Sequence, residues 1–406
     1  MDKVKIGVIG GGRGKSMIRY GREASNAQLV AICDFRDDVL DRMKKECGED
    51  SISYYKECTV MKYNFVSRDT VAYFEKIVNV PSPVGYYVQM NPVMEQLAQE
   101  LGYTVTYDNK HTPYITLEGQ DNSRTVLVGA HLDTLGMVVR CIDADGMIRV
   151  RQLGGVNYAS LEGETVTIHT RDGCSYTGLM ACQSHSVHVF DDARSVERNE
   201  NTMMVILDQP VKSKADVNAL GIRHGDMISV DPRCQFTENG YLKSRFIDDK
   251  AAVACCFTAL KYLKEQGLKP KYRTLLAFPY SEEIGLGGTY VPAEVSEYVA
   301  IDIGLIGPGY DGEERKVTIC AKDASTPYDY ELTSRLIELA EQNGIDHAVD
   351  IFYRYGTDAN AALKAGNNLR AAAFGMAVYC SHGMERTHLE GLNATVELLL
   401  SYLLEG

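Results

Sequence analysis

The sequence contains no Cys-x-x-Cys pair, although it has 11 cysteines, and two of them, Cys255 and Cys256, are adjacent. This pattern does not suit a disulfide framework and is typical of reduced thiols in the cytoplasm. The chain also lacks a long apolar leader after its N-terminal lysines and any hydrophobic run of membrane-spanning length. These absences predict a soluble, cytoplasmic protein with no membrane partner.

An excess of positive charge is missing as well. The chain has 42 lysines and arginines against 55 aspartates and glutamates, which gives a formal net charge of -13 at pH 7. Nucleic acids and anionic membranes attract basic surfaces, so we expect neither to be the main partner. No internal repeat or low-complexity segment occurs in the 406 residues, a length that has room for two or three domains.

Residues 1–60 carry the pattern of a dinucleotide-binding unit. An apolar strand from Val4 to Ile9 precedes the glycine turn Gly10-Gly11-Gly12-Arg13-Gly14, a helix from Ser16 to Glu23, and a second strand from Gln28 to Cys33 that ends at Asp34. Glycines let the backbone approach a pyrophosphate, and the acid takes a ribose hydroxyl.

This arrangement resembles the first βαβ of the glucose-fructose oxidoreductase / inositol dehydrogenase family. Lys15 stands where that family has its third glycine, its catalytic Glu-Lys-Pro motif is absent, and we expect no further strands in that pattern. We interpret residues 1–60 as a partial Rossmann βαβ fragment, fused or misjoined before a complete protein that begins near Met61. An NAD(P)-linked oxidoreductase is the alternative, and unchanged tyrosine fluorescence and melting temperature on adding nicotinamide cofactors would exclude it.

From Met61 onward, the sequence alternates between helical and strand patterns, which predicts an α/β domain. Residues 61–136 and 231–406 form its two halves, and short β-like segments with intervening turns in residues 137–230 predict an inserted all-β domain. Apolar periodicity predicts helices within 65–78, 91–101, 251–263, 328–343, 356–365 and 392–404, and strands at 125–129, 274–278, 298–304, 317–321 and 371–378.

The stretch from Tyr272 to Gly288 is the most informative in the chain. It starts as an apolar strand and turns directly into Glu282 and Glu283, followed by glycines. Adjacent carboxylates repel each other and are costly to desolvate unless a cation meets them. A metal ion, with one glutamate as ligand and the other free as a base, is one solution. A solvated pair in a loop is the simpler alternative.

Other ligand-type residues occupy equivalent positions. His131 and Asp133 follow the strand at 125–129, and two residues apart on an extended chain they project to the same side, so the carboxylate can orient the imidazole. Asp248 opens a long helix, where an acid can also simply complement the helix dipole. Asp302 and His382 each end or follow an apolar strand.

Together these positions predict a metal centre. Ligands gather outside the carboxyl ends of the strands in an open α/β sheet. Two histidines and three carboxylates suit a pair of divalent ions bridged by one carboxylate. The set comprises His131, Asp248, Glu283, Asp302 and His382.

The order and local motifs resemble the glutamyl-aminopeptidase or tetrahedral-aminopeptidase family of dinuclear metallopeptidases (metallopeptidase family 42), from Met61 to Gly406. The matching segments are PSPVG at Pro81, AHLDTLG at Ala130, IDDKAA at Ile247, SEEIGLGGT at Ser281, AIDIG at Ala300, GTDA at Gly356 and SHGMERTH at Ser381. The resemblance implies a phosphorylase/hydrolase-like α/β/α metallopeptidase domain with an inserted PDZ-like β barrel for dimerisation. It also implies peptide substrates and dimers that assemble into a tetrahedral dodecamer.

The resemblance also implies roles for individual residues. His131, Asp248 and Asp302 would hold one Zn²⁺ or Co²⁺ ion, and Asp248, Glu283 and His382 the other. Glu282 would be the general base, and Asp133 would orient His131. The sequence departs from the family's Asp-Asn-Arg at Asp248-Asp249-Lys250 and from the Ser-Pro that usually follows the last histidine, which leaves His388 as the alternative to His382.

Three further alternatives stay open. The pair His185 and His188 can bind metal, but in a strand-like stretch their side chains point to opposite faces, so we expect a structural or surface role. Family members are also labelled endoglucanases, yet a glycosidase needs two carboxylates facing each other across the scissile bond, about 5–9 Å apart. A non-catalytic relative that kept the fold is the third.

Overall fold

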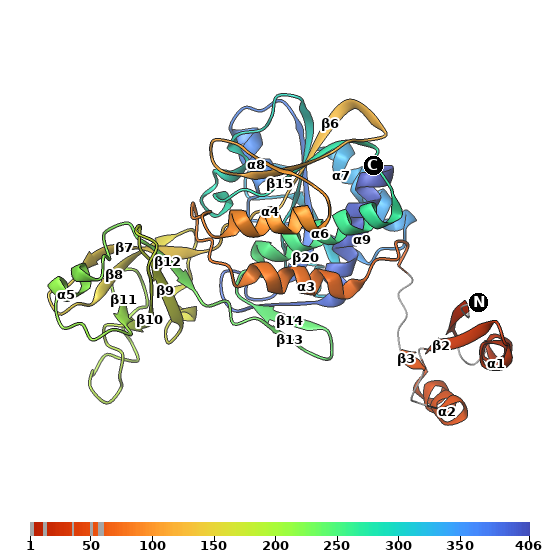
Figure 1. Cartoon of the computed structure of the whole chain (residues 1–406), viewed down its shortest axis with the longest axis horizontal. Coiled ribbons are helices and arrows are strands. Elements are labelled where there is room, and N and C mark those ends of the chain that lie inside the picture. The colour runs from red at the N-terminus through yellow and green to blue at the C-terminus, as the bar shows by residue number, and fades with distance from the viewer. Residues whose placement is uncertain (1–3, 11–13, 35, 49–51, 56–60) are drawn as a thin grey trace. The chain divides into compact units, whose positions relative to one another are not determined.

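The computed structural model describes residues 4–10, 14–34, 36–48, 52–55 and 61–406, so Gly11, Gly12 and Arg13 of the predicted glycine turn lie outside the described residues. The chain divides into two compact units, Met1–Lys62 and Tyr63–Gly406 (Figure 1). Each unit is described by itself. None of the helices in the described ranges is both long enough and apolar enough to cross a membrane.

The first unit is a small parallel sheet with the strand order β1-β2-β3. Its elements are β1 (Val4–Ile9), α1 (Lys15–Glu23), β2 (Ala27–Cys33), α2 (Asp37–Cys47) and β3 (Ser53–Tyr55). The expectation that no further strand follows the first βαβ is therefore wrong. A strand of three residues is too short to show an apolar run, and α2 buries only Val39, Leu40 and Met43.

The second unit is built on a nine-stranded sheet. Along the sheet the strands follow in the order β19 (His347–Ile351), β18 (Val317–Lys322), β20 (Arg370–Val378), β16 (Val295–Ile301), β6 (Asp121–Gly129), β15 (Tyr272–Ala277), β5 (Pro113–Leu117) and β4 (Val105–Tyr107), and β17 (Gly304–Leu305) pairs with β20. The central strands β15, β6, β16 and β20 are parallel neighbours, so their carboxyl ends share one edge.

Helices cover this sheet, and they lie where the sequence predicts them to within a few residues (Figure 1). Their bounds are α3 (Ser67–Val78), α4 (Met90–Glu100), α6 (Ile247–Gln266), α7 (Tyr330–Gln342), α8 (Asp358–Lys364) and α9 (Leu389–Glu405), with single 3₁₀ turns at Tyr158–Ser160, Glu282–Ile284 and Gly287–Thr289. Helix α6 is buried on almost all sides, because it packs between α3 and α9. Its small residues, such as Ala251, Ala254 and Cys255, permit that close approach.

Strands β7 to β12 form a closed barrel in the order β10-β11-β8-β7-β12-β9. Their bounds are β7 (Gly136–Ile142), β8 (Ile148–Leu153), β9 (Thr165–His169), β10 (Ser175–Cys182), β11 (Met203–Leu207) and β12 (Met227–Val230), with the short helix α5 (Lys214–Ala219) before β12. The strand expected around His185 and His188 is wrong, because these residues lie in exposed turns after β10. Both histidines are surface residues.

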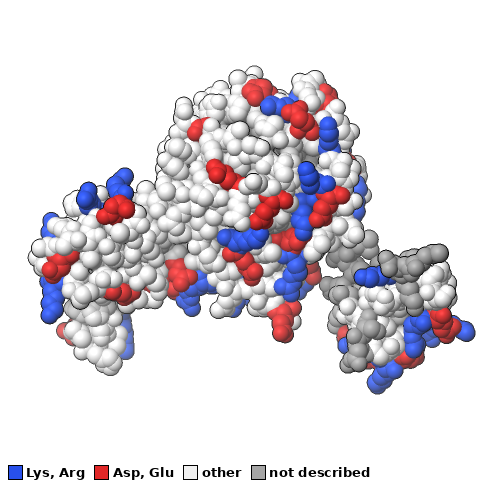
Figure 2. Space-filling model, in the orientation of Figure 1, with Lys and Arg blue, Asp and Glu red and all other residues white. Residues whose placement is uncertain are grey.

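A third, small sheet lies between the barrel and the rest of the α/β domain in the order of the chain, since β13 and β14 follow the last barrel strand. It has the order β13-β14-β21, formed by β13 (Gln235–Phe236), β14 (Tyr241–Ser244) and β21 (Glu385–His388). On the face drawn in Figure 2, the acidic and basic side chains of the described residues are interspersed, and lysines and arginines do not gather into an extended basic surface there.

Candidate active site

The predicted ligand residues converge on the edge at which the central parallel strands end. His131 lies just beyond β6, Glu282 and Glu283 beyond β15, Asp302 beyond β16, and His382 beyond β20, and Asp248 lies in the first turn of α6. Since β15, β6, β16 and β20 are adjacent and parallel, residues distant in sequence meet there.

His131 is buried and lies beside three acidic residues. Its Nε2 lies 3.1 Å from Asp248 Oδ1 and 3.7 Å from Glu282 Oε2. Its Nδ1 lies 3.0 Å from the backbone oxygen of Asp133 and 3.5 Å from a carboxylate oxygen of the same residue. Burial alone would lower the pKa of His131, but these acids outweigh burial and raise it well above its usual value.

Asp133 has a second task that the sequence did not reveal. Its two carboxylate oxygens accept hydrogen bonds from the backbone N–H groups of Glu282 and Glu283, each at 3.1 Å. The carboxylate is fully buried. Asp133 therefore fixes the loop that carries both glutamates, besides lying beside the imidazole of His131.

His382 reaches the other side of Asp248. Its Nε2 lies 3.6 Å from Asp248 Oδ2 and 3.5 Å from Glu283 Oε2. Its Nδ1 lies 2.9 Å from the backbone oxygen of Gly155, in the loop after β8 of the barrel. This contact turns Nε2 toward the acids. His388 is not at the site, because its Nδ1 accepts the N–H of Glu390 as the cap of α9 and its Nε2 donates to Asn239 O at 2.9 Å.

A cluster of three carboxylates joins Asp248 to Asp249 and Asp302, with ligand atoms all within 4.8 Å of one another. Burial, and next the negative charge of Asp248, raise the pKa of Asp302 to about 8. Asp249 is fully buried, and its Oδ2 accepts the N–H of His131 at 3.0 Å. Its Oδ1 has no hydrogen-bond partner among the described residues.

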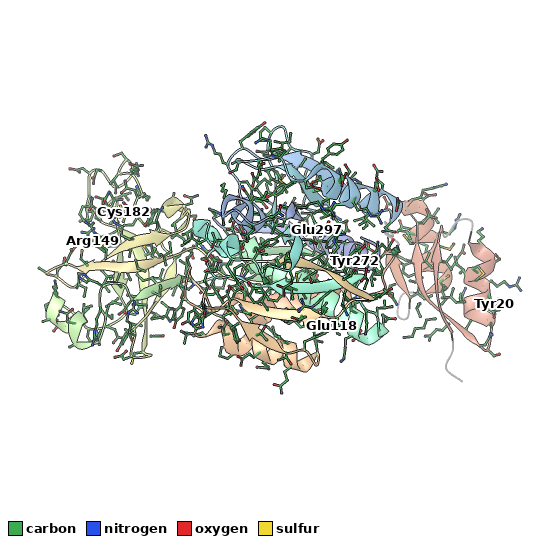
Figure 3. All side chains as sticks on the ribbon, turned by 90° about the horizontal axis from the view of Figure 1, so that it is seen from above. Tyr20, Glu118, Arg149, Cys182, Tyr272 and Glu297 are labelled. Atoms are coloured by element: carbon green, nitrogen blue, oxygen red, sulfur yellow. The ribbon has the colours of Figure 1, made fainter. Side chains whose placement is uncertain are left out.

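Burial also raises the pKa of Glu282, Glu283 and Asp249 well above the usual carboxyl range, and neighbouring acids add to the effect. The opposite end of β16 offers a comparison within the same sheet. There the buried carboxylate of Glu297, labelled in Figure 3, forms ion pairs with Arg124 and Arg370. No lysine or arginine makes such a pair with the acids of the candidate site in the described structure.

The donor set therefore fits divalent cations. It combines imidazole nitrogens and carboxylate oxygens, which suit metals such as zinc and cobalt. Beside these ligands lies a buried acceptor, Asp249 Oδ1, that the rest of the described protein leaves without a partner. A bound cation would supply the positive charge that arginine supplies to Glu297.

Two supporting residues were missed from the sequence. Glu385 is buried and accepts the backbone N–H groups of Asp248 and His382, each at 3.0 Å, so it joins two ligand-bearing segments. Asp358 is buried and accepts the N–H of Gly288 at 2.6 Å, which fixes the loop after Glu283. Both lie in recognised motifs, but nothing in the sequence showed that they bond to backbone.

A cavity of about 270 Å³ opens onto these acids. It is lined on one side by Asp248, Glu282, Glu283, Asp302 and His382. Much of the remaining lining comes from the segment 354–364, which leads into and forms α8. A cavity with convergent polar groups at the carboxyl ends of parallel strands is the usual place for a ligand in this type of sheet.

Comparison with known sequences gives a consistent family. The sequence model described as M42 glutamyl aminopeptidase matches residues 113–398. The chain is 40% identical over 337 residues to YhfE of Bacillus subtilis (strain 168), provisionally named an aminopeptidase, which covers 83% of this chain and 97% of YhfE. It is 24% identical to the glutamyl aminopeptidase of Lactococcus lactis subsp. cremoris (strain MG1363), over 54% of this chain and 62% of the relative. It is 23% identical to the lysyl aminopeptidase of Pyrococcus furiosus, over 53% and 60%.

Comparison with solved structures supports the same fold. The TET aminopeptidase of Thaumarchaeota archaeon SCGC AB-539-E09 aligns with a TM-score of 0.75 and 18% identity, over 84% of this chain and 97% of that structure. The TET1 peptidase of Pyrococcus horikoshii, described as assembling into a tetrahedron or a large octahedral shell, aligns with a TM-score of 0.72 and 23% identity, over 83% and 100%. The α/β peptidase fold expected from the sequence is thereby confirmed.

Proposed function

The chain belongs to the M42 glutamyl aminopeptidase family, and from this membership we propose that it is a metal-dependent aminopeptidase that removes N-terminal residues from peptides. The observation that most directly supports metal dependence is the position of Asp248. Its carboxylate belongs to two groups of possible ligand atoms, one with His131 and Glu283 and the other with Asp249 and Asp302. A carboxylate shared by two cations is typical of two-metal hydrolases.

In this proposal His131, Asp248 and Asp302 hold one Zn²⁺ or Co²⁺ ion, and Asp248, Glu283 and His382 hold the other. When bound, such cations supply Lewis acidity and lower the pKa of water toward neutrality. Asp249 and Glu385 then act indirectly, since they hold the backbones of ligand residues in place. Buried partners of this kind keep ligands in one orientation.

Glu282 is the proposed general base. Its carboxylate lines the cavity beside His131 but is not needed as a ligand. It accepts a proton from the attacking water as the oxygen adds to the scissile carbonyl carbon. It returns that proton to the amine nitrogen as the C–N bond breaks, so the carboxylate is regenerated. Asp133 holds the backbone of Glu282 for this transfer.

The charge of the cavity also supports exopeptidase action. The acidic side of the cavity suits the α-ammonium group of a peptide N-terminus, whereas an internal peptide bond offers no such charge. We further propose that the chain forms homo-oligomers, dimers through the barrel that assemble into a dodecamer. This rests on the fold shared with the Pyrococcus horikoshii assembly.

The decisive experiment compares short peptides with free and acetylated N-termini, before and after chelation. We expect cleavage of the free-amino peptides only, lost with chelator and restored by zinc or cobalt. Equal cleavage of acetylated peptides would contradict the exopeptidase proposal. Activity on a β-glucan that survives chelation would instead favour a carboxylate-only glycosidase.

A further inference from the structure

The candidate site has a second feature that catalysis does not use, namely two cations on the wall of the cavity. We propose that Arg354 and Lys364 recognise a carboxylate of the peptide substrate, so that the enzyme prefers acidic or very short peptides. This inference rests on the proposed aminopeptidase function. Family membership alone does not set the preference, because the relatives include one named glutamyl and one named lysyl aminopeptidase.

Arg354 and Lys364 are the only lysine or arginine side chains among the described residues that line this cavity. They come from the two ends of one short segment, Arg354 from the loop before α8 and Lys364 from the last turn of α8. The other ionisable groups lining the cavity are the acids Asp248, Glu282, Glu283 and Asp302, with His382 and Tyr355. The cavity therefore has an acidic part and a cationic part.

Neither cation has a partner of opposite charge in the described structure, and both side chains are exposed. Two other arginines of this domain differ, because Arg370 pairs with Glu331 at 3.3 Å and Arg386 pairs with Glu314 at 2.6 Å. In a chain with 55 acids against 42 bases, two unpaired cations beside one cavity are free to bind an incoming anion. Arginine in particular binds carboxylates through two parallel hydrogen bonds.

Asn360 adds an independent sign of a ligand. It lies on α8 four residues before Lys364, so both residues occupy the same side of the helix, and it lines the same cavity. Its amide nitrogen donates to the carboxylate of Asp323, which fixes the orientation of the amide group. Its Oδ1 is buried and has no partner among the described residues. This oxygen is suited to accept an N–H of a bound peptide next to its carboxylate.

The charge pattern matches a zwitterion. The acidic part suits the α-ammonium group of a peptide, and the cationic part suits a carboxylate on the same molecule. That carboxylate can come from an acidic side chain of the N-terminal residue or from the C-terminus of a very short peptide. The chemistry is the same for both sources, so substrates must separate them.

The test uses the full chain loaded with zinc and two pairs of nearly isosteric substrates. Glutamyl and glutaminyl p-nitroanilide differ in the side-chain carboxylate, and trialanine and trialanine amide differ in the terminal carboxylate. We expect kcat/KM to favour the carboxylate member of at least one pair by tenfold or more. The single variants Arg354→Gln and Lys364→Gln should each reduce this ratio several-fold, and the double variant should bring it to about one, mainly through KM.

Arg140→Gln and Lys269→Gln are matched controls. Each replaces an exposed cation that makes no side-chain ion pair in the described structure and does not line the cavity. These controls should leave the ratio unchanged. The inference would be overturned if the kcat/KM ratio were near one for both pairs in the wild-type enzyme. It would also be overturned if a tenfold preference for the carboxylate substrate persisted in the double variant. In both cases the proposed function would stand. If the zinc- or cobalt-loaded enzyme cleaved none of the four substrates, both this inference and the proposed aminopeptidase function would be overturned.

Discussion

Individual buried carboxylates are stabilised in two different ways in this protein. At the amino end of β16, Glu297 has arginine partners and also accepts the hydroxyl of Tyr402 at 3.1 Å. At the carboxyl end of the same sheet, the acids face one another, backbone N–H groups, two histidines and the Tyr355 side chain, and no described lysine or arginine forms an ion pair with them. Mutual repulsion in a buried site is costly unless a cation is present. The contrast separates an acid that serves packing from acids that we propose to bind metal.

The two adjacent glutamates should respond differently to the same substitution. Glu282→Gln removes the base but keeps the size of the side chain, so we expect kcat to fall by about 10²–10⁴-fold with metal content unchanged. Glu283→Gln replaces a proposed ligand, so we expect bound metal to fall as well. Steady-state kinetics with metal analysis distinguishes these outcomes, and an equal loss of metal in both variants would contradict the division of roles.

His169 in β9 provides a pH prediction outside the metal centre. Its ring lies 2.8 Å from Ser229 Oγ and 3.1 Å from Ser175 Oγ and stacks on Tyr86, and burial lowers its pKa to about 4. In the unfolded chain the pKa of histidine is about 6.5, so between pH 6.5 and 4 the unfolded state binds a proton that the folded state does not. The stabilisation from neutral His169 is therefore complete above pH 6.5 and is lost as the pH falls.

We expect His169→Gln to destabilise the protein at pH 7 more than at pH 4.5, with a difference of roughly 2 kcal/mol after allowance for partial solvent screening. Urea unfolding of both proteins at the two pH values measures this difference. His188→Gln, in an exposed turn, is the control and should show no pH-dependent change. A pH-independent effect of the His169 substitution would contradict the prediction.

At the scale of elements, the sequence predicts the parts that have a strong period. The apolar strands before His131, Glu282 and His382 and the long helix after Asp248 all form close to their expected bounds. Their order along the chain, combined with the rule that parallel strands place ligands at one edge, also brings the five predicted ligand residues together. Because these strands and helices are buried, they need apolar residues at regular spacing, and that spacing can be recognised in a single sequence.

Elements and contacts with weak local signals were not predicted. Helix α2 buries only three residues and strand β3 is three residues long, and the turns around His185 resemble a strand only because Val187 and Val189 alternate with polar residues. Two supporting contacts join residues more than a hundred positions apart in the sequence. The Glu385 carboxylate accepts the backbone N–H of Asp248, and the Gly155 carbonyl bonds to the imidazole of His382. Such contacts arise from tertiary structure, and sequence spacing carries no record of them.

The contact between β16 and β20 gives a prediction at this scale. A Cβ atom on Gly375 of β20 would lie 1.5 Å from the backbone oxygen of Asp302, and Asp302 N donates to Phe374 O at 3.0 Å. Gly375→Ala must therefore push apart the two strand ends that carry Asp302 and His382. We expect a loss of stability of about 2–4 kcal/mol, together with weaker metal binding.

Differential scanning calorimetry and metal titration would measure both effects of Gly375→Ala. Gly307→Ala is the matched control, because its Cβ would meet only ring atoms of Tyr310 at 3.6 Å and farther, which is ordinary contact. We expect that variant to be stable and to bind metal normally. A stable Gly375→Ala protein with normal metal affinity would show that the strands separate without disturbing the site.

At the scale of the whole molecule, the barrel contributes to the site. The carbonyl of Gly155 holds His382 Nδ1, and Arg245 next to α6 donates to Ser160 O at 2.8 Å. The insertion and the α/β domain thus share one network around the proposed metals. The insertion therefore supports the candidate site in addition to its proposed role in assembly.

The first unit, in contrast, has its own core, formed by residues such as Val8, Ile32 and Met43. The family match lies entirely within the second unit. A protein that begins at Met61 keeps Tyr63, whose ring packs against Tyr262 at 5.8 Å and whose hydroxyl bonds to Glu405. We therefore expect this shortened protein to stay soluble, to melt at nearly the same temperature, and to cleave peptides with kcat/KM within twofold of the full chain. An insoluble or inactive product would show that residues 1–60 take part in folding or function, and a cofactor-dependent melting shift confined to the full chain would assign them nicotinamide binding.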